Sequence, residues 1–495
     1  MTDLFRRSAL EIAAAIRDGE VSSREAVDAH IEGIEAVNPT INAVVQTRYE
    51  AARREADAAD ALRARTDPSE LPAFHGVPCT IKECFALTGM EQTAGLVARK
   101  GRVATRDASA VERLRAAGAI PLGVTNLSEL CMWMESNNKV YGRSNNPYDP
   151  SRIVGGSSGG EGAIVGAGAS PFGLGSDIGG SIRMPAFFNG VFGHKGSSGL
   201  IPNTGQYPIA ENEALSYLCT GPLCRRAEDL MPLLRVLAGP DGQDPSCQDY
   251  ELGEPRDVDL GSLRVLDIPD NGRHSVSGEL SAARAAVVEH LAFLGARVER
   301  PQLPSLKKSF DIWSSMMHEA AGTSFADLLG DGRSFRSFRQ LGHWLTGRSP
   351  HTLAGLVLAA FEGATDIPPG KAARWAAVGR DLRAEVDDLL GEDGVLIYPS
   401  YPVTAPRHGQ PLLRPLRFVY TAILNILLLP VTQVPLGLDS RGLPLGTQVA
   451  AGRGQDHITV AVAQELERAF GGWVPPSAPG ATNLQANSSP EAPEA

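Results

Sequence analysis

Apolar and polar positions alternate along this chain in short blocks that predict strands and helices in turn. Apolar runs bounded by glycine or polar turns predict buried strands, and a spacing of three to four residues predicts amphipathic helices. We expect strands at 76–85, 120–124, 263–268, 394–398, 431–438 and 445–451, and helices at 107–118, 277–295, 371–390 and 456–470. This alternation favours an α/β fold in which helices cover a large twisted mixed sheet.

Three segments depart from the alternation. Residues 8–65 read as helices, and the spacing of Ser22 and Glu25 resembles a capping box at the start of one of them. Residues 304–363 are helical, apolar and irregular, and we expect them to form a cover over the sheet. Residues 476–495 are rich in Pro, Ser, Ala and Asn, which predicts a disordered tail. The remaining residues, 1–475, are predicted to form one domain.

The longest mainly apolar run, 418–438, is not predicted to cross a membrane. It contains Asn425 and Gln433 as well as two prolines, and it breaks into a helical half and a strand-like half. A buried helix and strand therefore explain it better than a transmembrane span. No apolar stretch follows the first seven residues, so no signal peptide is predicted.

Composition and charge narrow the class of protein. The chain has 495 residues, of which 43% are hydrophobic and 21% charged, and its formal net charge is −11. A nucleic-acid-binding protein would need a basic face, so that class is disfavoured. The six cysteines form no C-x-x-C pair and no zinc-like cluster. We interpret them as the reduced thiols of a cytoplasmic protein.

The region from Gly155 to Gly199 is unusual because 15 of its 45 residues are glycine. Each glycine loses extra backbone entropy on folding, so we expect little ordinary helix or strand there. Such a backbone can approach a ligand closely and direct N–H groups at it. Ser157 and Ser181 lie within this region. A serine in this setting suggests a nucleophile beside an oxyanion hole.

Lys82 is the candidate base for such a serine. It stands at the end of the apolar strand predicted at 76–85, where desolvation favours the neutral amine. A neutral amine can accept a proton from a serine hydroxyl. The alternative is structural: the side chain extends out of the strand end or pairs with Glu83.

Two other interpretations of the glycine-rich region compete on the residues alone. Ser157 and Ser158 each fit the G-x-S-x-G nucleophile elbow of an α/β-hydrolase, with His408 and His457 as later histidines. However, no buried strand is predicted to run into Ser157, as an elbow requires. A phosphate-binding loop is also disfavoured, because no G-x-x-x-x-G-K-[ST] motif occurs.

The order of these motifs resembles the amidase signature family. Lys82 is followed by GGSSGGEG at 155–162 and by DIGGSIR at 177–183. Other stretches resemble the fatty-acid amide hydrolase branch of that family: IKECF at 81–85, NLSELCMW at 126–133, YGRSNNPY at 141–148, RMPAFFNG at 183–190, LPVTQ at 429–433 and GLPLG at 442–446. The likeness extends over residues 10–473 and implies an amidase signature fold.

The resemblance implies a Ser–Ser–Lys triad that hydrolyses amides through an acyl-enzyme. Ser181 would be the nucleophile, Ser157 the bridging serine and Lys82 the base. Members of the family hold the bridging serine after a cis peptide, which would here join Gly156 to Ser157.

The backbone around the expected nucleophile supplies the rest of the implied site. The N–H groups of Ile178, Gly179 and Gly180, with that of the nucleophile itself, would stabilise the oxyanion. Asp177 and Arg183 flank the nucleophile, and we expect them to form a structural ion pair. This mechanism needs no metal or organic cofactor, and we expect none.

The expected substrate site is apolar. Cys131, Met132 and Met134 fall where related enzymes line the acyl pocket, and their side chains would suit a long or aromatic acyl chain. Plain core packing is the alternative for each of them. Ser158 is expected beside the substrate as well, unless its hydroxyl only satisfies the loop backbone.

These residues predict an enzyme acting on hydrophobic amides, esters or carbamates, with no nucleic-acid partner and no transmembrane segment. The apolar cover is compatible with weak contact to a membrane surface or with a homodimer. An aryl acylamidase, a carbamate or ester hydrolase and a glutamine amidotransferase subunit remain open. A cysteine amidase using Glu83, Lys82 and Cys84 is disfavoured, because neighbours on a strand point to opposite faces.

Overall fold

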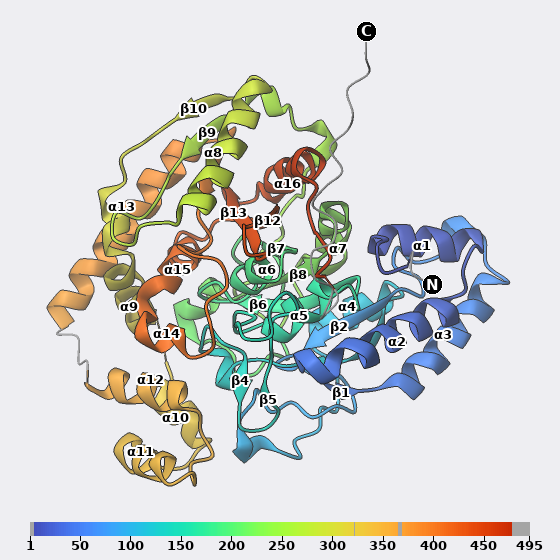
Figure 1. The fold of residues 1–495 in the computed structure, drawn as a ribbon, viewed down its shortest axis with the longest axis horizontal. Helices are drawn as coiled ribbons and strands as arrows, with labels where there is room; N and C mark the ends of the chain where they lie inside the picture. Colours follow the sequence, from blue (N-terminus) through green and yellow to red (C-terminus); the bar gives the residue numbers. More distant parts are fainter. Residues whose placement is uncertain (1–3, 321, 365–368, 478–495) are drawn as a thin grey trace.

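An 11-stranded mixed sheet runs through the computed structural model, which describes residues 4–320, 322–364 and 369–477 (Figure 1). Its order is β1 (Val44–Thr47), β3 (Ile120–Thr125), β2 (Pro78–Lys82), β6 (Phe172–Asp177), β8 (Cys219–Cys224), β7 (Phe192–Lys195), β12 (Val431–Leu438), β13 (Pro444–Ala451), β11 (Gly394–Tyr398), β9 (Arg264–Asp267) and β10 (Arg297–Glu299). A small separate hairpin contains β4 (Asn137–Asn138) and β5 (Gly142–Arg143). The predicted α/β fold with a large mixed sheet is confirmed.

Strand direction decides which strand ends meet. β2 runs parallel to both β3 and β6, so the carboxyl ends of these three strands lie at one edge. From β6 onward the pairs with β8, β7, β12 and β13 are antiparallel. In sheets of this kind, side chains just beyond the carboxyl ends of parallel strands commonly form the site. Lys82 ends β2 and Asp177 ends β6.

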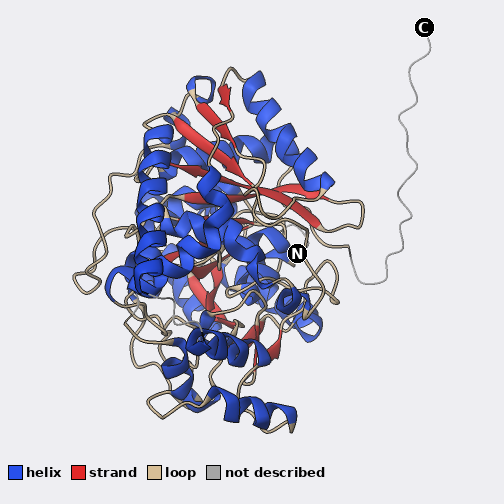
Figure 2. Ribbon diagram, turned by 90° about the vertical axis from the view of Figure 1, so that its left-hand side faces the viewer, coloured by secondary structure: helices blue, strands red, loops and turns tan. Residues whose placement is uncertain are grey.

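Helices lie on both sides of the sheet (Figure 2). They are α1 (Ala9–Asp18), α2 (Ser23–Ile41), α3 (Tyr49–Arg63), α4 (Ser109–Ala116), α5 (Gly159–Gly166), α6 (Arg183–Phe188), α7 (Leu230–Leu237), α8 (Gly278–Phe293), α9 (Ser309–Ala320), α10 (Phe325–Gly330), α11 (Ser337–Leu345), α12 (Leu353–Ala364), α13 (Pro369–Leu390), α14 (Gln410–Leu413), α15 (Val419–Ile426) and α16 (Asp456–Phe470). The predicted cover contains α9 to α12, of which α10, α11 and α12 lie together at one end of the molecule (Figure 1).

We expected residues 8–65 to be helical throughout, but they are not. The predicted capping box is present: the Ser22 side chain accepts from Glu25 N–H, and the Glu25 carboxylate accepts from Ser22 N–H. Between α2 and α3, however, Val44–Thr47 forms β1 and pairs antiparallel with β3. This four-residue edge strand is too short to show a period of two, and its neighbour on the sheet is far away in the sequence.

The glycine-rich region is more regular than we expected. It contains α5, α6, β6 and β7, so the expectation of little ordinary helix or strand there is wrong. Glycine serves close packing instead: a Cβ on Gly173 in β6 would lie 1.8 Å from Glu161 Oε2 on α5. The entropy lost by glycine is thus offset by a helix packed closely against the centre of the sheet.

The apolar run 418–438 forms α15 and β12, the predicted helix and strand, and α15 is buried throughout. Within the described ranges, no helix is both long and apolar enough to cross a bilayer. The predicted tail falls largely on residues 478–495, which lie outside the described residues.

Candidate active site

Lys82 meets two serine hydroxyls at the shared edge of β2 and β6. Its Nζ donates to Ser157 Oγ at 2.7 Å and to Ser176 Oγ at 2.9 Å. The lysine is fully buried, and Ser157 is 1% exposed. In the part of the chain that the structure describes, no carboxylate forms a salt bridge with this amine. The amine is therefore held by hydroxyl groups, with which it can exchange a proton.

Ser157 and Ser181 are brought together by the backbone. The Gly156–Ser157 peptide is cis, and the N–H of Ser158, at the start of α5, donates to the carbonyl of Ser181 at 3.1 Å. No hydrogen bond joins the two hydroxyls among the described residues, although such contacts often tighten only when substrate binds. Ser181 is 8% exposed, more than Ser157 or Lys82.

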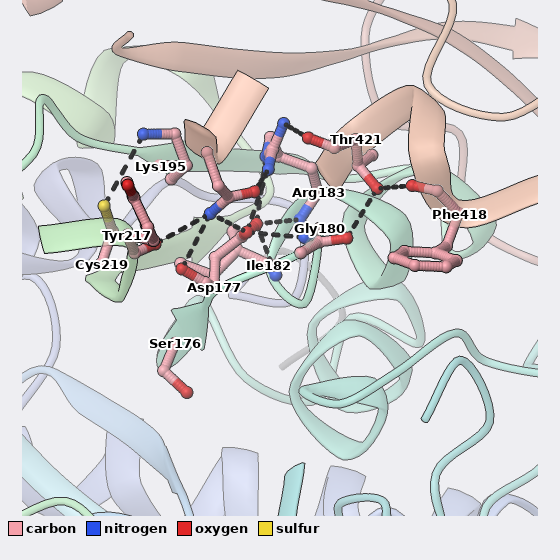
Figure 3. A network of polar contacts seen from close by, with 12 residues as sticks. Ser176, Asp177, Gly180, Ile182, Arg183, Lys195, Tyr217, Cys219, Phe418 and Thr421 are labelled. Atoms are coloured by element: carbon pink, nitrogen blue, oxygen red, sulfur yellow. Dashed lines mark hydrogen bonds and ion pairs between the residues drawn. The ribbon is translucent and has the colours of Figure 1, made fainter. Parts of the chain in front are cut away.

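Ser176 was not predicted from the sequence. It is the fifth residue of β6, and its side chain points away from the polar cluster around Asp177 (Figure 3). Its hydroxyl contacts both Lys82 Nζ and, at 3.7 Å, Cys84 Sγ. No local motif marks it, because its role depends on β2 lying beside β6.

The Cys131 thiol is influenced by the candidate base. Hydrogen bonding from Cys84, together with the charge of Lys82, lowers the pKa of the Cys131 thiol. Burial raises the pKa of the Cys84 thiol.

The loop after β6 presents free backbone donors beside Ser181. Asp177 Oδ1 accepts from Gly180 N–H at 2.7 Å, and Asp177 Oδ2 accepts from Ile182 N–H at 3.0 Å. The N–H groups of Ile178, Gly179 and Ser181 donate to no acceptor within the described residues. Gly180, although expected as an oxyanion donor, is thus occupied by Asp177 in this state. The other three amides are available to an oxyanion.

The predicted ion pair between Asp177 and Arg183 is present and fully buried, with 2.9 Å between Arg183 Nη2 and Asp177 Oδ1 (Figure 3). Burial alone would raise the pKa of Asp177. The charge of Arg183 and the surrounding donors instead hold that pKa well below its usual range. The pair therefore keeps an ionised carboxylate at the base of the loop that carries Ser181.

Behind Lys82 lies a buried carboxyl, Glu161. It accepts from the hydroxyls of Thr80 at 2.7 Å and Thr125 at 2.8 Å. Burial raises the pKa of Glu161 to about 8, despite these donors and the charge of Lys82. The site thus contains a carboxyl group that favours its neutral form.

We expect Glu161→Gln to flatten the pH dependence of stability. The raised folded-state pKa means that the stabilising contribution of the proton is complete below the ordinary value of 4.5 and is lost as pH rises toward 8. Over that window the wild-type free energy of unfolding should fall relative to the variant by on the order of 1 kcal/mol per pH unit. Urea denaturation at several pH values measures this difference. Exposed Glu50→Gln is the control, and parallel curves for wild type and Glu161→Gln would contradict the prediction.

Glu83 faces different partners from Lys82. Its carboxylate accepts from Thr93 N–H and Oγ1, from Ala94 N–H and from Tyr141 Oη, and burial raises its pKa to about 7. Neither Glu83 oxygen bonds to Lys82 in the described structure. A Glu–Lys–Cys site is therefore not assembled here.

The two histidines considered for a nucleophile elbow lie elsewhere. His408 Nδ1 is 2.6 Å from Glu135 Oε1, and its Nε2 is 3.1 Å from the carbonyl of Pro150. His457 lies in the first turn of α16, and its ring packs against Gly253, where a Cβ would lie within 3 Å of it. Ser157 follows a loop rather than a strand. The elbow is not formed.

A cavity of about 270 Å³ opens beside the predicted acyl pocket. Met132 and Trp133 line it, together with the start of α12 and residues near His408. The carbonyl of Trp133 abuts Gly156, where a Cβ would lie 2.2 Å from that oxygen. Met134 is instead buried in a core cluster with Phe188. Ser158 Oγ bonds to the backbone of Ser176.

Glu129 connects this cavity to the helical cover. Its carboxylate accepts from Thr352 N–H and Oγ1, and its Oε1 is 2.8 Å from His351 Nδ1. The start of α12 is therefore held against the segment that carries Cys131 and Met132. Within the described ranges, no group of three or more His, Cys, Asp or Glu side chains is placed to hold a metal ion.

Comparison with known proteins gives consistent likenesses. A family model described as Amidase matches residues 25–460. The chain is 48% identical over 490 residues to fatty-acid amide hydrolase 2-A of Danio rerio, covering 96% of this chain and 90% of that protein. It is 47% identical over 489 residues to fatty-acid amide hydrolase 2 of Homo sapiens, covering 96% and 91%. A solved structure of 6-aminohexanoate cyclic dimer hydrolase with substrate matches with a TM-score of 0.80 at 28% identity, over 94% of this chain and 98% of that one.

Proposed function

This chain belongs to the amidase signature family of amide-hydrolysing enzymes, and on that premise we propose that it is a serine hydrolase with a Ser181–Ser157–Lys82 triad. The observation that carries the proposal is the 2.7 Å hydrogen bond from Lys82 Nζ to Ser157 Oγ, in a buried site whose backbone adjoins Ser181. No other described hydroxyl combines a contact to this lysine with a backbone link to a second, more accessible serine.

The proposed reaction moves one proton along these three side chains. The Lys82 amine accepts a proton from Ser157, which takes one from Ser181 as Ser181 Oγ attacks the substrate carbonyl carbon. The carbonyl oxygen becomes an oxyanion, stabilised by the free N–H groups of Ile178 and Gly179. The carbon–nitrogen bond then breaks, and the leaving amine receives the proton through Ser157. Water repeats the attack on the acyl-enzyme and releases the acid.

We propose fatty-acyl or aryl amides as the substrate class. Support comes from the identity of nearly half of all aligned positions with two proteins named fatty-acid amide hydrolase 2. Met132 and Trp133 present apolar side chains to the 270 Å³ cavity, which suits such an acyl group. None of Lys82, Ser157 and Ser181 lines this cavity, and charged residues such as Glu129 and Arg143 do. Carbamates and esters share the same acyl carbon chemistry and remain secondary substrates of the proposed triad.

Oleamide, an acyl-anilide, an aryl carbamate and acetamide should be assayed side by side. We expect kcat/KM on oleamide to exceed that on acetamide by at least about 100-fold, because each buried methylene adds to transition-state binding. Ser181→Ala provides the blank. Equal rates on oleamide and acetamide would reject the hydrophobic substrate class. Little hydrolysis of any amide, with a partner subunit co-purifying, would instead favour an amidotransferase subunit.

We also propose that the protein works in the cytoplasm. All six cysteines are free thiols, and four of them are buried, as expected for a chain that folds under reducing conditions.

A further inference from the structure

The loop that precedes Ser181 packs against α15, a helix about 240 residues further along the chain. Thr421 Oγ1 lies 2.9 Å from the carbonyl oxygen of Gly179. Gly180 has a φ of +111°, and a Cβ there would lie 2.0 Å from Thr421 Oγ1. Figure 3 shows Thr421 and Arg183 on the side of this loop opposite to Ser176. The helix therefore packs directly on backbone that the proposed reaction uses.

Two residues of α15, Thr421 and Asn425, contact this loop, and the contact made by Thr421 is the weaker one. Its single hydroxyl proton is shared between the carbonyls of Gly179 and Phe418, at 2.9 and 2.8 Å. A hydroxyl can donate to one acceptor fully or to two weakly. The more specific contact comes from Asn425, one turn further along α15.

Both the nitrogen and the oxygen of the Asn425 carboxamide form hydrogen bonds. Its Nδ2 is 2.9 Å from Asp177 Oδ1, 3.1 Å from the Asp177 carbonyl and 3.1 Å from the Tyr217 carbonyl. Its Oδ1 accepts from Arg183 Nη2 at 2.6 Å. Because a guanidinium only donates and a carboxylate only accepts, only one orientation of this amide fits both Arg183 and Asp177.

Asn425 thus bridges the two members of the buried ion pair. Asp177 in turn accepts from the N–H groups of Gly180 and Ile182, which fixes the backbone on both sides of Ser181. Asn425 is 1% exposed and the ion pair is fully buried, so water cannot replace a lost contact without entering the core. A change at Asn425 would be transmitted through Asp177 to the N–H groups beside the nucleophile.

We propose that Asn425 is a positioning residue for the oxyanion hole, acting through Asp177 to aim the free N–H groups of the 178–181 loop at the developing oxyanion. This inference rests on the proposed function of Ser181. Asn425 touches neither the substrate nor the reacting serine. It sets the geometry of groups whose strength depends on alignment within a few tenths of an ångström.

The test is Asn425→Ser, compared with wild type in kcat and KM per active site titrated with a fluorophosphonate. We expect kcat per labelled site to fall by about 10- to 100-fold, less than the loss of a whole oxyanion donor. KM should change by less than about twofold, because ground-state binding is not affected. Thr421→Val should lower kcat by a smaller factor and serves as the second variant if Asn425→Ser does not fold.

A transition-state probe separates positioning from folding. A fatty-acyl trifluoromethyl ketone gains an oxyanion when Ser181 adds to its carbonyl, whereas the corresponding alcohol cannot. Asn425→Ser should weaken binding of the ketone by the same factor by which kcat/KM falls, and it should leave binding of the alcohol unchanged. Equal loss for both ligands, or an unchanged kcat per labelled site with a lower melting temperature, would overturn the proposal.

Asn146→Ser is the matched control. Asn146 is a buried asparagine that donates to the carbonyls of Ile153 and Phe188, away from the 178–181 loop. It should lower the melting temperature without changing kcat per labelled site. If wild type is not labelled at Ser181 at all, the proposed function fails; if it is labelled and Asn425→Ser keeps full kcat, only the positioning role fails.

Discussion

Ser181→Ala will remove amide hydrolysis almost completely, with a loss in kcat of at least about 10⁴-fold. The reason is that the proposed acyl-enzyme forms on the Ser181 hydroxyl, which the substitution removes. The variant should also lose labelling by a fluorophosphonate, which mass spectrometry of wild type should locate on Ser181. Because the substitution removes only one oxygen from a nearly buried side chain, the melting temperature should change little.

Cys84→Ala is the control for the competing nucleophile. Its thiol lies in the same cluster, 3.7 Å from Ser176 Oγ, and is fully buried. We expect this variant to keep labelling at Ser181 and most of its rate. Loss of activity in Cys84→Ala with retention in Ser181→Ala would assign the acyl group to sulfur and reject the proposed triad.

Elements with clear local boundaries were predicted closely from the sequence. The bounds of β11, β12 and α16 agree with the predictions for 394–398, 431–438 and 456–470. Each is an apolar or amphipathic block that ends at glycine, proline or a polar turn, so local propensity and tertiary packing agree.

β6 and β7 were missed because their glycines suggested irregular backbone. In β6, Gly173 and Gly175 leave room for Glu161 and for Ile182. Such glycines are set by the neighbouring layer, which a single sequence does not reveal. β1 was missed for a related reason, since its pairing with β3 joins positions about 80 residues apart.

The residues of the candidate site also fall into two groups, those that the sequence predicted and those that it did not. The bond between Lys82 and Ser157 and the ion pair between Asp177 and Arg183 connect residues that lie in recognisable motifs. Ser176 and Asn425 lie in no such motif, and each acts only because sheet order or α15 brings it to the loop. Residues that act on another residue's geometry carry no local signal, whereas residues that carry out chemistry often do.

Lys82→Ala should lower kcat by about 10²- to 10⁴-fold near neutral pH, which is the range expected for loss of a general base. The loss should shrink as pH rises, because hydroxide can then remove the serine proton in place of the amine. Rates measured from about pH 6 to about pH 10 on one soluble amide give this comparison. The variant's rate should rise with pH throughout, whereas the wild-type rate should change less over the same range, because it does not depend on hydroxide.

Lys195→Ala tests whether any buried lysine would have the same effect. Lys195 is fully buried in β7 and donates to the Gly196 carbonyl and to Cys219 Sγ (Figure 3 shows the second contact), and no serine hydroxyl is among its partners in the described residues. Removing it should lower the melting temperature and leave the pH–rate profile of the remaining folded enzyme in place. If Lys82→Ala had the same profile as wild type, the proton would have to leave Ser181 by another route, and Ser157 would lose its role as a bridge.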